Sequence, residues 1–224
     1  VATQELEAYD YYLRGLQYFY TLTESSVDIA REMFQRAIDI DPLFARAYAG
    51  LANAESTTAQ WFDHSTARLE AADRASRRAL ELAPGLAEAR SARGYALTLS
   101  GDFAEAAREF ESALEIEPAN YEALYLFARS RFAEGKMAEA AALFRAAHET
   151  QPDEFQAITL LEGTLRAMGA DQEQLVEATK LGVAAIQNRL ELNPDDQRAL
   201  NLGCSLLVSD GQVERGLEMA RRLL

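Results

Sequence analysis

The sequence predicts an all-α protein made of stacked helix pairs, and the first observation behind this prediction is the spacing of its prolines. The five prolines are separated by 42, 34, 34 and 42 residues and are Pro42, Pro84, Pro118, Pro152 and Pro194. Each follows a segment of helical character, such as "EAAREFESALEIEP", and no convincing strand pattern interrupts the chain. Proline ends helices, and a fixed period of about 20 to 50 residues is typical of helical repeats. Each interval therefore predicts one helix pair.

The second observation is a recurring pattern of two alanines seven residues apart with a phenylalanine between them. It occurs as Ala30–Phe34–Ala37, Ala106–Phe110–Ala113 and Ala140–Phe144–Ala147. Offsets of four and three residues place these side chains on one face of a helix. In the first four pairs the preceding helix supplies a small residue of its own, namely Gly15, Ala52, Gly94 or Ala128. We therefore expect the two helices of each pair to pack closely.

This pattern resembles the tetratricopeptide repeat. Two segments fit the family pattern of small residue, turn, alanine, phenylalanine, alanine and proline: "AEARSARGYALTLSGDFAEAAREFESALEIEPAN" at 87–120 and "YEALYLFARSRFAEGKMAEAAALFRAAHETQPDE" at 121–154. The resemblance implies a right-handed α-α superhelix, a TPR solenoid, that forms a single domain of about six helix pairs. We expect these pairs at about 5–42, 43–84, 85–118, 119–152, 153–194 and 195–224.

Two of the pairs are eight residues longer than the others. In the second pair the extra residues surround "STTAQWFDHST", and we expect them to lengthen both helices around their shared turn. In the fifth pair Gly169 still ends the first helix, and Asp171 with Gln174 has the pattern of an N-cap box. There we expect the second helix to be longer by about two turns, or roughly 12 Å.

The composition argues against two classes of partner. Lys and Arg total 22 and Asp and Glu total 36, which gives a formal charge of −14 and a pI near 4.6. Nucleic-acid affinity comes largely from Lys and Arg that neutralise phosphates, so we expect no nucleic-acid partner. The same charge opposes binding to an anionic membrane. Since no apolar run reaches the ~20 residues of a membrane span and no signal peptide is visible, we expect a cytoplasmic protein.

No catalytic, cofactor or metal site is predicted. His64 and His148 lie in different repeats, and neither belongs to an H-E-x-x-H pattern. Cys204 is the single cysteine, which excludes a disulfide framework and a cysteine-based zinc site within the chain. The carboxylates fit solvated helix faces that pair with Arg and Lys. We therefore expect this chain not to be an enzyme and to need no cofactor.

The resemblance implies a protein-binding groove, because in this family the first helix of each pair lines a concave face where peptides dock. The matching positions include Arg46, Asn53, Tyr95, Tyr125, Arg129, Phe132, Arg166, Arg198 and Asn201. The four arginines there, set against Glu88 and Glu122, give a local charge of 4 − 2 = +2. Arginine beside aromatic residues is typical of interface anchors. The hypothesis is that the groove binds an acidic or carboxylate-bearing segment; the alternative is an ordinary surface with partly buried aromatics.

Trp61 and Phe62 form a second candidate contact at the tip of the first insertion. Turns of this repeat are usually polar, so adjacent aromatic residues there are unusual. One interpretation is packing against the neighbouring helix pair. The other is a docking site for a further domain or subunit.

The first pair, with "AYDYYLRGLQYFY", also resembles the C-terminal repeat regions of bacterial multidomain signalling proteins, such as class III adenylate or guanylate cyclases. That resemblance implies a regulatory or scaffolding fragment whose catalytic domain, a cyclase or a kinase, lies outside this sequence. The missing initiator Met fits a fragment, and Leu223 with Leu224 ends the chain without a covering helix, which favours further repeats or a homodimer through this end. The alternative is a free-standing adaptor or assembly factor of cell-envelope or secretion machinery.

Overall fold

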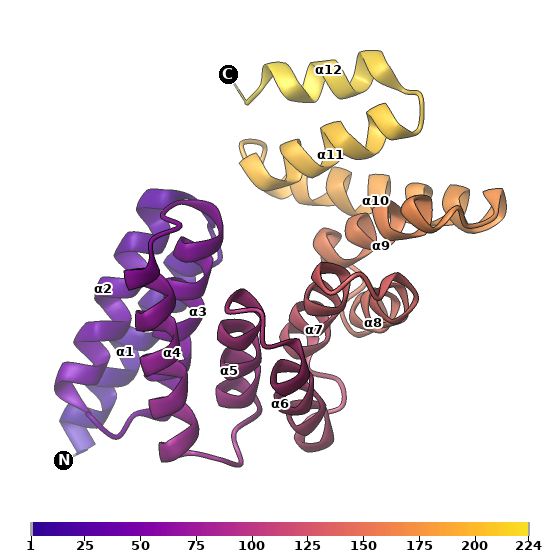
Figure 1. The fold of residues 1–224 in the computed structure, drawn as a ribbon. Coiled ribbons are helices and arrows are strands. Elements are labelled where there is room, and N and C mark those ends of the chain that lie inside the picture. The colour runs from indigo at the N-terminus through magenta and orange to yellow at the C-terminus, as the bar shows by residue number, and fades with distance from the viewer. Residues whose placement is uncertain (1, 224) are drawn as a thin grey trace. The chain divides into compact units, whose positions relative to one another are not determined.

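The computed structural model describes residues 2–223, and within them it consists of α-helices without a β-strand (Figure 1). The predicted all-α fold of six helix pairs is confirmed. The described helices are α1 (Ala2–Phe19), α2 (Glu24–Ile40), α3 (Ala45–Trp61), α4 (Thr66–Leu82), α5 (Ala87–Leu99), α6 (Phe103–Ile116), α7 (Tyr121–Ala133), α8 (Met137–Thr150), α9 (Phe155–Met168), α10 (Gln172–Leu192), α11 (Gln197–Ser209) and α12 (Val213–Arg221).

The chain forms two compact units, Val1–Ser130 and Arg131–Leu224, referred to here as unit 1 and unit 2. Unit 1 contains α1 to α6 and most of α7, and unit 2 contains the end of α7 with α8 to α12. The organisation of the whole chain as a single solenoid domain stays a prediction. Leu224, part of the predicted uncovered end, lies outside the described residues.

The two insertions lengthen helices as expected. Helices α3 and α4 have 17 residues each, against 13 in α5 and 14 in α6. In the fifth pair α10 has 21 residues against 14 in α8, an excess of about two turns. Gly169 ends α9 with a φ of 67°, a left-handed conformation that glycine adopts without steric cost. The Asp171 side chain then accepts a 2.9 Å hydrogen bond from the main-chain N–H of Gln174 and caps α10.

The alanine–phenylalanine–alanine faces belong to the core of the first and third pairs, and the third such face is buried on α8. Phe34 and Phe110 are fully buried, and Phe144 is 1% exposed. The flanking alanines of all three triplets are 0% exposed. In unit 1 the glycines opposite these rings are required by space: a Cβ on Gly15 or Gly94 would lie 2.6 Å from Phe34 or 2.8 Å from Phe110. The repeating pattern thus predicted these buried positions correctly.

We expect Gly94→Ala to lower the free energy of unfolding by about 1–2 kcal/mol, because the added methyl group overlaps the Phe110 ring in a packed core. Intrinsic helix propensity favours alanine over glycine by about 1 kcal/mol. The expected loss is therefore the net of this gain and the larger cost of the steric overlap. Urea unfolding followed by circular dichroism would measure it. Gly163→Ala is the matched control, since no atom lies within 4 Å of the added Cβ in this helix; equal stability of the two variants would contradict the prediction.

Arg90 and Arg93 occupy positions of α5 where the repeat family usually has large apolar residues, and each has a carboxylate partner. The Arg90 guanidinium lies 2.8 Å from Glu109 of α6. Arg93, only 7% exposed, donates a 2.6 Å hydrogen bond to Asp73 of α4. Burial opposes ionisation of Asp73, but hydrogen bonds from its arginine neighbours outweigh it and lower the pKa of this carboxyl. These ion pairs replace apolar contacts between neighbouring helices.

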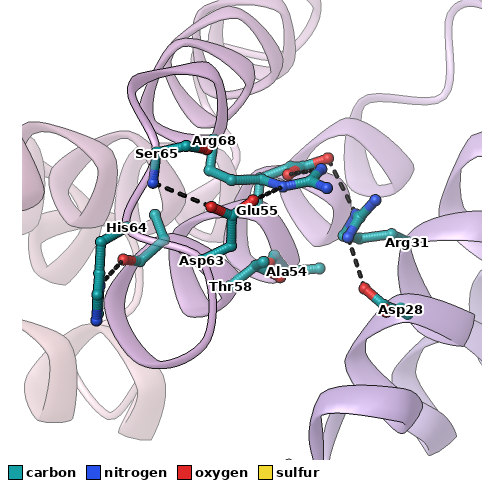
Figure 2. Close-up of polar contacts among 10 residues, drawn as sticks. Asp28, Arg31, Ala54, Glu55, Thr58, Asp63, His64, Ser65 and Arg68 are labelled. Atoms are coloured by element: carbon teal, nitrogen blue, oxygen red, sulfur yellow. Dashed lines mark hydrogen bonds and ion pairs between the residues drawn. The ribbon is translucent and has the colours of Figure 1, made fainter.

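A polar network centred on Glu55 joins the first two pairs (Figure 2). Glu55 lies on α3, and its carboxylate accepts hydrogen bonds of 3.1 Å from Arg31 of α2 and from Arg68 of α4. Arg31 also contacts Asp28 at 2.6 Å, and Arg68 contacts Asp63 at 3.1 Å. The Glu55 side chain is 10% exposed, so two guanidinium groups neutralise one buried charge. The network therefore connects α2, α3 and α4 through hydrogen bonds between charged side chains.

The turn after α3 is stabilised by local hydrogen bonds (Figure 2). Hydrogen bonds from the Ser65 side chain, from Arg68 and from the Ser65 main-chain N–H hold the pKa of Asp63 below its usual value. The His64 Nδ1 atom lies 2.8 Å from the main-chain oxygen of Ala59, within hydrogen-bond distance. His64 therefore contacts the end of α3.

Candidate functional site

An arginine of unit 1 is surrounded by three aromatic rings. Arg129 lies on α7, and its guanidinium carbon is 5.6 Å from the ring centroid of Trp61, 5.7 Å from that of Tyr95 and 5.6 Å from that of Tyr125. A guanidinium within about 6 Å of a ring centroid is attracted to the negative face of the ring. The rings come from α3, α5 and α7, so three successive first helices contribute to the arrangement.

Gln60 fixes the geometry of this arrangement. Its Oε1 atom accepts a 2.5 Å hydrogen bond from Arg129 Nη2 and a 2.6 Å hydrogen bond from the Tyr95 hydroxyl. Burial raises the pKa of Tyr95, so the hydroxyl stays protonated and can donate. We call Gln60, Trp61, Tyr95, Tyr125 and Arg129 the Arg129 cluster.

Arg129 lacks an acidic partner within unit 1. Of the twelve arginines between residues 4 and 130, ten form ion pairs with Asp or Glu, and the exceptions are Arg36 and Arg129. Arg36 is exposed on α2, where water solvates its charge. Arg129 is half-buried, and its neighbours within unit 1 are three rings, the hydroxyl groups of two of them and an amide oxygen. This guanidinium is therefore suited to meet an incoming anion.

A second group of polar residues surrounds Glu122, two turns before Arg129 on α7. Asn53 Nδ2 donates a 2.9 Å hydrogen bond to Glu122 Oε1, and Arg46 lies 3.3 Å from Glu88. Burial, and then the nearby charge of Glu88, raise the pKa of Glu122 to about 7. Burial, followed by the charge of Glu88, likewise raises the pKa of Tyr12 to about 12. We call these five residues the Glu122 cluster.

The predicted groove residues divide between the two units. Five lie in the two clusters of unit 1, namely Arg46, Asn53, Tyr95, Tyr125 and Arg129. Four lie in unit 2: Phe132, exposed on α7; Arg166, whose guanidinium contacts the buried carboxylate of Glu162; Arg198, half-buried on α11; and Asn201, exposed on α11. The structure brings the first five together, and a binding role for all nine stays a prediction.

The structure separates Trp61 from Phe62, which the sequence predicts as one candidate contact. Phe62 is half-buried and packs against the core cluster that contains Phe19 and Phe34. Trp61 is 54% exposed and contacts the guanidinium of Arg129. Packing within the fold thus accounts for Phe62, whereas Trp61 belongs to the Arg129 cluster.

The sequence predicts neither the role of Gln60 nor the desolvation of Glu122. Gln60 and Arg129 are 69 residues apart, and so are Asn53 and Glu122. Both distances are close to two repeat lengths, so the period of the repeat was the one available signal. Within the described residues no group of three or more His, Cys, Asp or Glu side chains is arranged to hold a metal ion. Of the helices in this part of the chain, none has the length and hydropathy needed to cross a membrane.

Comparison with known proteins supports the repeat assignment. Residues 97–163 match the family model described as tetratricopeptide repeat. No curated protein gives a significant sequence match.

Solved structures share the fold at low sequence identity. The human IFIT1 dimer with m7Gppp-AAAA aligns at a TM-score of 0.70 and 17% identity over 90% of this chain and 46% of its own, so the chain spans about half the length of IFIT1. Pseudomonas aeruginosa PilF aligns with a TM-score of 0.64 and 17% sequence identity over 99% of this chain and 92% of its own. TTC0263, a TPR protein of Thermus thermophilus, aligns with a TM-score of 0.66 and 17% sequence identity over 90% of this chain and 99% of its own. At these identities the likeness shows the fold alone.

Proposed function

From the match of residues 97–163 to the tetratricopeptide-repeat model, we propose that this chain is a tetratricopeptide-repeat protein and a non-catalytic protein-interaction module that binds a carboxylate-bearing segment of a partner protein at the Arg129 cluster. The observation that carries this proposal is the half-buried guanidinium of Arg129, which has aromatic neighbours but no carboxylate within unit 1. A carboxylate that approaches it gains charge-assisted hydrogen bonds in a partly desolvated place, where such bonds are strong. Acidic side chains or a free C-terminus would both supply this group.

The composition of the cluster supports a protein partner. Trp, Tyr and Arg are the residues most enriched among the energetic anchors of interfaces. Trp61 leaves about half of its surface open to solvent, while Tyr95 and Tyr125 are buried. Rigid, preformed contact groups lose little conformational entropy when a partner binds. The cluster therefore fits a preorganised anchor for an otherwise flexible segment.

The biological setting that we propose is the regulatory or scaffolding region of a bacterial cytoplasmic signalling protein, with an adenylate cyclase as the model. The sequence resemblance of the first helix pair to such regions supports this setting. The intact mass of the protein from its native cell tests it: a mass well above 24.8 kDa, with a cyclase or kinase sequence in the additional part, is expected. A mass equal to that of this chain would contradict it and leave the interaction module unaffected.

We expect Arg129→Met to weaken binding of acidic peptides by about 30-fold, the loss of about 2 kcal/mol typical of an interface anchor. Methionine keeps much of the length of arginine and removes the charge. Peptides selected by the protein from a displayed library of random twelve-residue sequences serve as the probe. Isothermal titration calorimetry measures the dissociation constants, and we expect the selected peptides to be enriched in Asp and Glu.

Arg36→Met is the matched control for Arg129→Met, because Arg36 is also without an acidic partner in unit 1 but is exposed on α2. It should leave peptide affinity unchanged. The oligonucleotide m7Gppp-AAAA, present in the IFIT1 structure, is a second probe. A net charge of −14 predicts no binding of it. Peptide affinity that survives Arg129→Met, or selected peptides without acidic residues, would contradict the proposed function.

A further inference from the structure

The geometry points to a second subsite at the Glu122 cluster, which takes the ammonium or guanidinium group of a basic side chain on the same partner segment. Asn53 is 8% exposed, and its Oδ1 atom is buried without a hydrogen-bond partner, while its Nδ2 atom donates to Glu122. The inference rests on the proposed function, because it assigns a second contact to the segment that Arg129 anchors. The partner segment would then carry both an acidic group for Arg129 and a basic group for Glu122.

The acidic side of the subsite is not neutralised by the protein itself. The ion pairs of unit 1 do not include Glu122, and the nearest base of the cluster, Arg46, lies 3.3 Å from Glu88. Desolvating a carboxylate without a cation beside it is costly, and a bound cation would offset that cost. The same desolvation, followed by the charge of Glu88, raises the pKa of Glu122 to about 7.

The hydrogen-bonding groups at this place match a basic side chain. An ammonium group has three N–H donors and no acceptor, and a guanidinium has five donors. The Glu122 carboxylate and the unpaired Asn53 Oδ1 supply only acceptors to such a group. An apolar side chain would leave the Asn53 oxygen without a donor, and an acidic one would add a like charge beside Glu88.

The spacing of the two subsites sets the spacing of charges in the partner. Glu122 and Arg129 are seven residues apart on α7, so their positions are separated by about 10 Å along the helix axis. An extended polyproline II segment rises about 3.1 Å per residue and returns to the same side every three residues. The partner therefore carries a basic and an acidic residue three positions apart.

The test uses acetylated and amidated peptides with the sequences Ala-Lys-Ala-Ala-Glu-Ala and Ala-Glu-Ala-Ala-Lys-Ala, since the direction of the bound segment is open. Replacing Lys by Ala in the better binder should cost about tenfold in affinity with the wild-type protein. With Glu122→Gln, the Lys and Ala peptides should bind equally. Glu115→Gln, at an exposed position of α6, is the matched control and should keep the tenfold preference for Lys.

The pH dependence of binding provides a second readout. Lys binding requires ionised Glu122, so lowering the pH from 8 to 6, through a pKa near 7, should weaken the Lys peptide about tenfold. The titratable and charged groups that face Glu122 from the packed helices are Glu88, Arg46 and Tyr12, and burial raises the pKa of Tyr12 to about 12. Glu122→Gln, which retains both histidines, should abolish this pH dependence.

The stability of the unliganded protein separates a binding role from a structural one. A raised pKa means that the folded state holds the Glu122 proton more tightly than the unfolded state, so ionisation at pH 8 destabilises the fold. Glu122→Gln should therefore raise the melting temperature at pH 8 while it weakens Lys-peptide binding. A lower melting temperature, or a Lys preference that persists in Glu122→Gln, would overturn the second subsite. The Arg129→Met experiment tests the proposed function independently of these results. If Arg129→Met weakens binding of acidic peptides, the proposed function stands even without the second subsite. If Arg129→Met leaves that binding unchanged, the proposed function is overturned.

Discussion

Phe110→Ala is expected to lower the free energy of unfolding by about 3–5 kcal/mol, which is a large part of the 5–15 kcal/mol that stabilises a typical domain. Phe110 of α6 is fully buried, packs against the Gly94 position of α5 and stacks on Phe127 of α7 at a centroid distance of 5.3 Å. Removing the ring loses its transfer free energy and leaves a cavity between three helices. Alanine is also a good helix former, so the loss comes from packing.

The matched control for Phe110→Ala is Phe132→Ala, because Phe132 is 43% exposed on α7. It should cost less than about 1 kcal/mol. Equilibrium urea unfolding, followed by both circular dichroism and tyrosine fluorescence, measures the two variants and shows whether the transition remains two-state. A loss of under 1 kcal/mol with Phe110→Ala would contradict the assignment of this ring as the centre of the third pair.

The fold could be predicted from the sequence because its determinants are local and repeat. Proline positions mark the ends of helices, and the spacing of Ala106, Phe110 and Ala113 defines one buried face without knowledge of the rest of the chain. The extension of α10 followed in the same way from the distance between Gly169 and Pro194. Both arguments use only the geometry of a single helix.

The candidate site could be predicted only in part, because its contacts join repeats that are far apart in the sequence. The repeat resemblance placed Arg129 and Tyr125 on an inner helix, yet no local pattern shows that Gln60 would bond to Arg129 across 69 residues. Residues that are adjacent in the sequence also have different surroundings at the end of a helix. Phe62 follows Trp61 directly, but it lies past the last turn of α3 and packs into the core.

Charge counting in the sequence did not distinguish the ion-paired carboxylate of Glu88 from the desolvated carboxylate of Glu122. Glu88 and Glu122 each contributed one negative charge to the expected groove. In the structure Glu88 is paired with Arg46, whereas burial raises the pKa of Glu122 to about 7. A formal charge depends on the residue type, but the protonation state depends on desolvation and neighbours, which three-dimensional packing determines.

Glu55→Ala is expected to lower the free energy of unfolding by about 3 kcal/mol, since removal of one member of a buried ion pair leaves uncompensated charge. Glu55 accepts hydrogen bonds from Arg31 and Arg68, and their side chains are 22% and 30% exposed (Figure 2). The expected loss lies at the lower end for buried pairs because Asp28 and Asp63 still contact the two arginines. Glu115→Ala, at an exposed position of α6, should change stability by less than about 0.5 kcal/mol.

A triple variant distinguishes the cost of stranded charge from the cost of lost contacts at the Glu55 network. Replacing Glu55 by Leu together with Arg31→Met and Arg68→Met removes all three charges and keeps apolar volume between α2, α3 and α4. Apolar replacements of buried ion pairs are often neutral or stabilising, so this variant should be more stable than Glu55→Ala by at least about 1 kcal/mol. If the triple variant instead unfolds more easily than Glu55→Ala, the network stabilises the fold through its hydrogen bonds and geometry. Charge compensation would then be the smaller effect, and the three helices would depend on this polar contact for their alignment.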